Sequence, residues 1–144
     1  MTHVFFTDRD LGKAFPAALR AAGLSVERHT DHFADNATDP EWLRVVGRQR
    51  WLALTHDRRI RYKTNERDAV MRAGVGLFVL VGQAPTLELA QNFVNSLGKV
   101  LEFLEINDPP FIAKIYRPVG DGVSNGLAGR VEMWVSRADW VPGR

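Results

Sequence analysis

The sequence of 144 residues contains no cysteine. This absence excludes disulfide bonds, a thiol nucleophile and thiolate-bound metals, so any metal must be held by carboxylate, imidazole, carbonyl or water ligands. Such ligands favour hard cations such as Mg²⁺ or Mn²⁺. The sequence also lacks an apolar run near the roughly 20 residues that span a bilayer, and its first residues lead into Asp8 rather than into a signal cleavage site. We therefore expect a cytoplasmic protein with no membrane partner.

The chain has no large excess of charge of either sign, since its net charge is only +2, but the charges are unevenly distributed along the sequence. Residues 44–72 carry nine bases and three acids, whereas residues 1–43 carry four bases and seven acids. Of the 19 basic residues 15 are arginine, which suits bidentate contacts to phosphate, although a genome rich in G and C enriches arginine regardless of function. A basic segment therefore lies beside an acidic one.

Short apolar runs alternate with helical patterns over the first hundred residues, and their spacing predicts the following elements. Strands are expected at residues 4–6, 24–29, 51–55 and 76–81, and helices at 11–22, 38–49, 64–74 and, as one long amphipathic helix, 86–106. Alternation after Pro110 predicts a terminal hairpin with strands at 111–116 and 129–135.

Continuously apolar strands of this kind are typical of a parallel sheet that helices cover on both faces. We therefore predict an α/β fold. Composition supports one folded unit, because 45% of the residues are hydrophobic and 25% are charged, and two halves of this chain would each be too small for a good core. The expected single domain spans 1–144, with its core at about 3–106 and its C-terminal strands at about 110–136.

Acidic residues follow the predicted strands. Asp8 and Asp10 come after the first strand, Asp57 comes after the third, and Asp39 and Glu41 open the helix that follows the second. The carboxyl ends of parallel strands meet at one edge of the sheet, where ligands bind. Because adjacent strands lie about 4.8 Å apart, carboxylates at neighbouring ends can share one divalent ion. Asp39 and Glu41 fit helix capping equally well.

Basic residues lie next to these acids along the chain, and we predict that they bind substrate phosphates. They are Lys13, Arg59, Arg61 and Lys63. The alternative for this segment is a solvated loop. The histidines His29, His32 and His56 lack the spacing of a metal site, and we interpret them as polar surface residues.

Several motifs, taken in order, resemble one known family. They are Phe5-Phe-Thr-Asp-Arg-Asp-Leu-Gly12, Leu19-Arg-Ala-Ala-Gly-Leu-Ser-Val26, Asp39-Pro-Glu-Trp-Leu43, Trp51-Leu-Ala-Leu-Thr-His-Asp-Arg-Arg-Ile60 and Pro110-Phe-Ile-Ala-Lys-Ile-Tyr-Arg117. Their order and spacing are similar to those of PIN-like nuclease domains, including toxins of VapC-type toxin–antitoxin systems. The resemblance covers roughly residues 3–117.

The resemblance implies a three-layer α/β/α sandwich that cleaves RNA with Mg²⁺ or Mn²⁺. It matches Asp8 and Asp57 to the strand-end metal ligands of the family, and Asp39 to its helix-borne acid, with Glu41 as a substitute. The catalytic residues would then be Asp8, Asp39 and Asp57. The fourth acid of the family has no clear counterpart.

Two residues, Asp10 and Glu66, are candidates for that fourth acid. The family also implies RNA as substrate and a cognate antitoxin as a possible protein partner. Dimerisation or antitoxin docking through the alternating strand at 129–135 is a further expectation.

Three alternatives stay open at this stage. The first is a PIN-like domain that has lost catalysis and binds RNA or protein. The second is a haloacid-dehalogenase-like phosphatase, which Asp8-Arg-Asp10 and Gly120-Asp-Gly-Val-Ser-Asn125 resemble, although Asn125 stands where that family has a second aspartate. The third is a phospho-accepting receiver domain, but no serine or threonine ends the strand at 76–81 and the later Lys-Pro pair of that family is absent.

Overall fold

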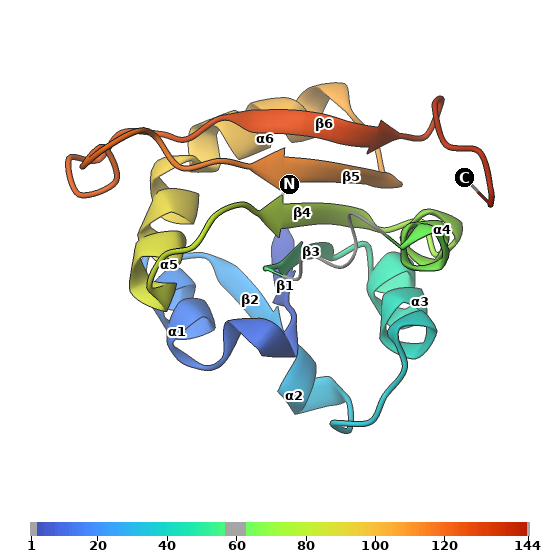
Figure 1. Cartoon of the computed structure of the whole chain (residues 1–144). Coiled ribbons are helices and arrows are strands. Elements are labelled where there is room, and N and C mark those ends of the chain that lie inside the picture. Colours follow the sequence, from blue (N-terminus) through green and yellow to red (C-terminus); the bar gives the residue numbers. More distant parts are fainter. Residues whose placement is uncertain (1–2, 57–62, 144) are drawn as a thin grey trace.

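Six strands form one sheet in the computed structural model, which describes residues 3–56 and 63–143 (Figure 1). They are β1 (Val4–Thr7), β2 (Ser25–Arg28), β3 (Leu52–Thr55), β4 (Gly76–Leu80), β5 (Phe111–Ile115) and β6 (Val131–Ser136). Their order across the sheet is β2-β1-β3-β4-β5-β6, and β1 to β5 are parallel. Only the terminal pair of these strands, β5 and β6, is antiparallel, as the predicted hairpin requires.

Helices cover both faces of this sheet. They are α1 (Ala14–Ala21), α2 (His29–His32), α3 (Asp39–Gln49), α4 (Thr64–Arg72), α5 (Thr86–Asn95) and α6 (Leu97–Ile106), with a 3-10 turn, η1 (Arg9–Leu11), before α1. The helices α1, α5 and α6 pack on one face, and α3 and α4 pack on the other (Figure 1). The predicted three-layer α/β/α fold is therefore confirmed. None of the described helices is long and apolar enough to cross a membrane.

Successive residues of each strand face opposite layers, and both sets are buried. Phe5 packs among the residues under α1 and α5, whereas its neighbour Phe6 packs under α3. The same alternation divides Leu54 from Ala53 on β3. This two-sided burial explains why the strands read as continuous apolar runs in the sequence.

The start of the first helix differs from the prediction. Instead of a helix over 11–22, the chain forms η1 and then begins α1 at Ala14. The Asp8 side chain caps the turn, and Gly12 has a positive φ of 66° that interrupts the helical path. Because the apolar spacing continues across Gly12, periodicity alone does not detect the interruption.

The prediction of one long helix over 86–106 is also wrong, since the two helices α5 and α6 meet at Ser96. The Ser96 side chain is buried, and its Oγ accepts a hydrogen bond of 2.8 Å from the backbone N–H of Gly129. This bond ties the break to the segment that leads into β6. The apolar residues continue at helical spacing through the break, and the sequence therefore gives no sign of it.

Candidate active site

Asp8 lies at the carboxyl end of β1, where its backbone N–H donates to the carbonyl of Leu54 on β3 at 3.0 Å. Its side chain is half-buried and accepts a 2.8 Å hydrogen bond at Oδ1 from the backbone N–H of Arg9, which begins η1. A strand that ends in an aspartate and turns at once into a helical turn holds the carboxylate at the edge of the sheet. The second oxygen, Oδ2, faces the end of β3.

Thr55, the last residue of β3, brings two carboxylates together. Its buried Oγ1 lies 3.1 Å from Oδ2 of Asp8 and 3.4 Å from Oδ2 of Asp10. The backbone N–H of His56 donates to the same Asp10 oxygen at 3.1 Å. The structure thus brings Asp8 and Asp10 to the same hydroxyl, while Asp57, the acid predicted at the neighbouring strand end, lies outside the described residues. The sequence reading missed Thr55, whose only signal was a polar residue that ends an apolar strand.

The electrostatic environment of Asp8 disfavours its ionised form. Burial raises the pKa of Asp8 above its ordinary value, and the negative charge of Asp39 acts in the same direction. The hydrogen bonds from Arg9 and Thr55 and the nearby His29 act in the opposite direction but are outweighed. A divalent cation beside Asp8 would stabilise the carboxylate that this environment destabilises.

Asp39 and Glu41 both take part in the start of α3. Thr38 and Glu41 form a capping box, in which Glu41 accepts from the Thr38 N–H at 3.3 Å and donates its own N–H to the Thr38 hydroxyl at 3.4 Å. Asp39 accepts a 3.0 Å hydrogen bond from the indole N–H of Trp42. Both side chains are exposed. The capping alternative is thus realised for Glu41, while Asp39 also acts on Asp8 through its charge.

The other predicted site residues are spread over different places. Asp57, Arg59 and Arg61 lie outside the described residues. Lys63 is exposed just before α4, and Lys13 is exposed just before α1. Lys13 lines a small cavity of about 170 Å³ that it shares with Asp8, Arg9, Arg28 and His29.

Glu66, the other candidate for the fourth acid, lies in the first turn of α4. Its side chain is partly buried. Asp10 shares the environment of Asp8, which makes it the better supported of the two candidates.

His29 is a correction to the sequence interpretation, since it is buried rather than on the surface. Only 1% of it is exposed, and its ring lies against the rings of Phe6, Phe33 and Trp42. Among the residues that the structure describes, neither ring nitrogen has a hydrogen-bond partner, and burial lowers the pKa of His29. The side chain follows β2 into the layer of α3, a position that strand periodicity does not reveal because α2 starts at this residue.

His56 has a structural link that the sequence did not suggest. Its ring Nε2 lies 2.6 Å from the carbonyl oxygen of Gly82, in the segment after β4. The neighbouring Arg117 donates to Glu88 at 2.8 Å and to the Gln83 carbonyl at 3.0 Å, which fixes the same segment. The ends of β3 and β4 are therefore joined beside Asp10.

The donor set at this edge fits a hard divalent cation. Its side-chain ligands would be the carboxylate oxygens of Asp8 and Asp10, and Mg²⁺ characteristically binds one or two carboxylates while it keeps several waters. Within residues 3–56 and 63–143, no group of three or more His, Asp or Glu side chains lies close enough to hold a metal. Of the described residues, Asp8 and Asp10 supply the carboxylates that meet at Thr55.

Comparison with known proteins gives one finding. A family model described as a PIN like domain matches residues 3–82, which are more than half of the chain and include β1 to β4 with Asp8, Asp10 and Asp39. No curated protein matches the chain. No solved structure matches it either. The chain therefore belongs to the PIN-like domain family, whose fold is of the nuclease type.

Proposed function

We propose that this protein is a metal-dependent endoribonuclease whose active centre lies at the Asp8–Asp10 edge of the sheet. The observation that carries the proposal is the approach of both carboxylates to one buried hydroxyl, that of Thr55. Burial raises the pKa of Asp8, and a carboxylate in such an environment beside other acids is typical of sites that bind a cation. PIN-like domains are generally nucleases, which makes phosphodiester hydrolysis the matching reaction.

Asp8 and Asp10 would hold Mg²⁺ or Mn²⁺, and Asp39 would contribute negative charge from the start of α3. A bound divalent cation supplies a more acidic water and positive charge at the phosphate. The protein contributes orientation, because Thr55 fixes the carboxylate of Asp8 and the His56 N–H fixes that of Asp10.

Positive charge for the substrate comes from Arg9 and Lys13. Both residues are exposed, and both line the cavity beside Asp8. They would hold the RNA backbone through its phosphates, which gives binding that depends on salt and carries little sequence information.

We also propose that the protein acts as the toxin of a toxin–antitoxin pair with a cognate antitoxin partner. The support for this role is the motif resemblance stated above. Induced expression in a bacterial host should arrest growth with the wild-type protein and not with Asp8→Asn. Growth arrest by both proteins to the same extent would contradict a toxic activity that depends on this site.

A cleavage assay on single-stranded RNA tests the proposed activity. The wild-type protein is compared with Asp8→Asn and Asp10→Asn, with and without Mg²⁺ or Mn²⁺. The matched control is Asp121→Asn, which makes the same chemical change at an exposed residue of the turn between β5 and β6. All four proteins are purified identically, so that a contaminating nuclease would appear in every preparation.

We expect metal-dependent cutting by the wild-type protein and by Asp121→Asn. Both site variants should lose at least a hundredfold, since removing even one preorganised hydrogen-bond donor that stabilises transition-state charge typically costs about 10²–10³ in rate. Equal cutting by the wild type and Asp8→Asn would refute the assignment. A protein that binds RNA but never cuts it would be a binding module.

A further inference from the structure

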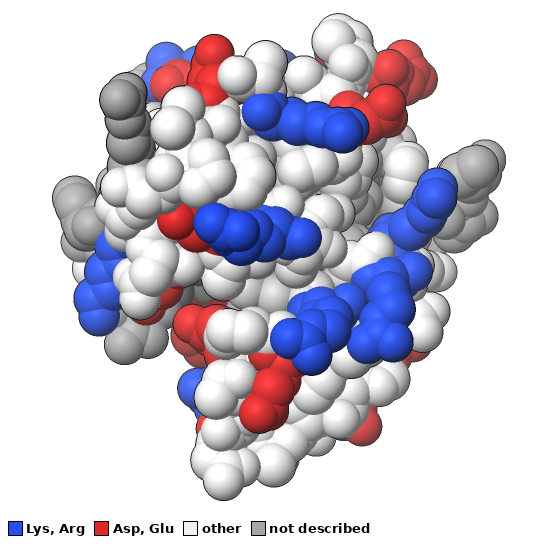
Figure 2. All heavy atoms as spheres, turned by 90° about the vertical axis from the view of Figure 1, so that its right-hand side faces the viewer, with Lys and Arg blue, Asp and Glu red and all other residues white. Residues whose placement is uncertain are grey.

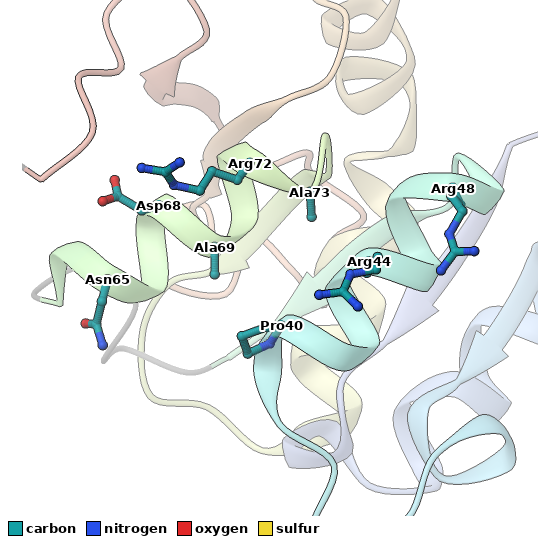
Figure 3. A pocket seen from close by; sticks show the side chains of 8 residues that line it. All are labelled: Pro40, Arg44, Arg48, Asn65, Asp68, Ala69, Arg72 and Ala73. Atoms are coloured by element: carbon teal, nitrogen blue, oxygen red, sulfur yellow. The ribbon is translucent and has the colours of Figure 1, made fainter.

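A groove lies between α3 and α4, on the side of the molecule that faces the viewer in Figure 2. Its volume is about 650 Å³. The side chains that line it are Pro40, Arg44 and Arg48 from α3 and Asn65, Asp68, Ala69, Arg72 and Ala73 from α4 and its end (Figure 3). Long basic side chains project at several places on this face (Figure 2).

Two arginines dominate the charge of the α3 wall. Arg44 and Arg48 are four residues apart on α3, so they lie on the same side of the helix with a separation of about 6 Å along its axis. Both are exposed, and neither has a hydrogen bond or ion pair within residues 3–56 and 63–143.

The local sequence offers these two arginines one acid at helical spacing, and that acid is already engaged. The residue four positions before Arg44 is Pro40, and the acid three positions before it, Glu41, is engaged in the capping box. Like charges four residues apart destabilise a helix. The two arginines therefore do not stabilise α3 by their charges, and their arrangement favours a role in binding an anionic ligand.

The α4 wall carries a balanced pair of charges. Asp68 points away from α3, and Arg72 runs along α4 toward it (Figure 3). Asp68 accepts from the indole N–H of Trp140 at 2.8 Å and from the backbone N–H of Gly143 at 2.9 Å. These bonds lower the pKa of Asp68 and commit its carboxylate to the C-terminal segment. The groove facing α3 therefore keeps the net positive charge of Arg44 and Arg48.

The floor of the groove contains only small side chains. Ala69 and Ala73 point toward α3 (Figure 3), and the backbone of Ala73 lies directly against Gly47 of α3. Protein partners are typically anchored by large apolar side chains in fitted pockets, and small residues at the floor leave no such pocket. Exposed arginines beside small side chains instead suit a backbone of repeated phosphates.

We propose that the α3–α4 groove binds the phosphate backbone of single-stranded RNA and extends the substrate-binding surface beyond the Asp8–Asp10 edge. The inference rests on the proposed ribonuclease function. Pro40, which lines one end of the groove, directly follows Asp39, the acid whose charge acts on Asp8. A strand bound at the catalytic edge can therefore continue into the groove. Arg44 and Arg48 contact successive phosphates, without reading the bases.

Binding of a 5′-fluorescein-labelled 12-nucleotide oligouridylate tests this groove by fluorescence anisotropy in EDTA, where metal-dependent cleavage is suppressed. The test variant is Arg44→Gln/Arg48→Gln. The matched control is Lys99→Gln/Arg130→Gln, which removes two positive charges from another hollow, on α6 and before β6. Circular dichroism and thermal melting confirm that both variants fold. A DNA oligonucleotide of the same length tests for preference between nucleic acids, and a poly-glutamate competitor tests for binding of acidic polypeptides.

The groove variant should bind several-fold more weakly than the control. Its slope of log affinity against log salt should fall by about 1.4, since each phosphate contact of a single strand contributes about 0.7. Equal affinity for RNA and an equal salt slope in the two variants would overturn the groove proposal, as would the absence of RNA binding by the wild type. Tighter binding of DNA than of RNA would also overturn it, and so would displacement of the labelled RNA by poly-glutamate as effectively as by unlabelled RNA. Failure of cleavage with retained groove-dependent binding would overturn only the proposed catalytic function.

Discussion

Replacing Gly47 by alanine tests how closely α3 and α4 must approach each other. A Cβ atom on Gly47 would lie 3.0 Å from the carbonyl carbon of Ala73 and closer still to the carbonyl oxygen, well inside the 3.0 Å limit that real Cβ contacts respect. The obstacle is backbone at the end of α4, which cannot rotate away as a side chain could. The two helices would therefore have to separate.

Two opposing contributions set the size of the effect. Overpacking of this kind costs about 3 kcal/mol at the upper end of the usual range, and alanine regains up to about 1 kcal/mol of helix propensity. The net loss in the free energy of unfolding is therefore about 2 kcal/mol. In a chain of this size about 3 °C of Tm corresponds to each kcal/mol, and we expect Tm to fall by about 6 °C.

The same substitution at Gly98 provides the control. Gly98 lies in α6 with nothing within 4 Å of its added Cβ, so Gly98→Ala should gain about 0.5 kcal/mol and raise Tm slightly. Thermal melting followed by circular dichroism compares the two variants with the wild type. If Gly47→Ala were as stable as Gly98→Ala, the close approach of α3 to α4 would be refuted, and with it the shape of the groove.

Three further predictions concern single side chains. Asp8→Asn should raise the free energy of unfolding of the metal-free protein at pH 7, because burial raises the pKa of Asp8 and so penalises its ionised form. This penalty is absent below the unfolded pKa of 3.8 and grows as the pH rises above it. Urea unfolding in EDTA at pH 3.5 and at pH 7 should therefore show the gain only at pH 7. His29→Phe should reduce the loss of Tm between pH 7.5 and 5, because a buried histidine with a lowered pKa contributes stability that is lost as the pH falls below 6.5; an unchanged loss would contradict this. Ser96→Ala should cost about 2 kcal/mol, because it leaves the buried N–H of Gly129 without its acceptor, and a change in Tm under 2 °C would count against that role.

Much of the fold followed from the sequence because apolar runs record two-sided burial. The strands and the capped start of α3 at Thr38 appear in the structure close to their predicted bounds. The errors fall where hydrophobic spacing continues through an interruption of the backbone, at Gly12 and at Ser96. In both places the interruption depends on backbone geometry or on a hydrogen bond to a distant segment, which periodicity does not encode.

The sequence predicted only those parts of the candidate site that lie directly at the ends of strands. Parallel pairing of β1 with β3 places Asp8 beside Thr55, and the turn after β1 returns Asp10 to the same hydroxyl. Thr55 and the buried His29 were missed because their roles depend on which layer of the sandwich each side chain enters. The α3–α4 groove was missed because its walls come from separate helices, and only their packing through Gly47 and Ala73 brings them together.

The central claim is that the Asp8–Asp10 edge holds the divalent cation that the proposed chemistry requires. Calorimetric titration of Mn²⁺ into the wild type, Asp8→Asn and Asp121→Asn tests it most directly. The account predicts binding by the wild type and by Asp121→Asn, and none by Asp8→Asn. Equal binding of Mn²⁺ by the wild type and Asp8→Asn would contradict the account.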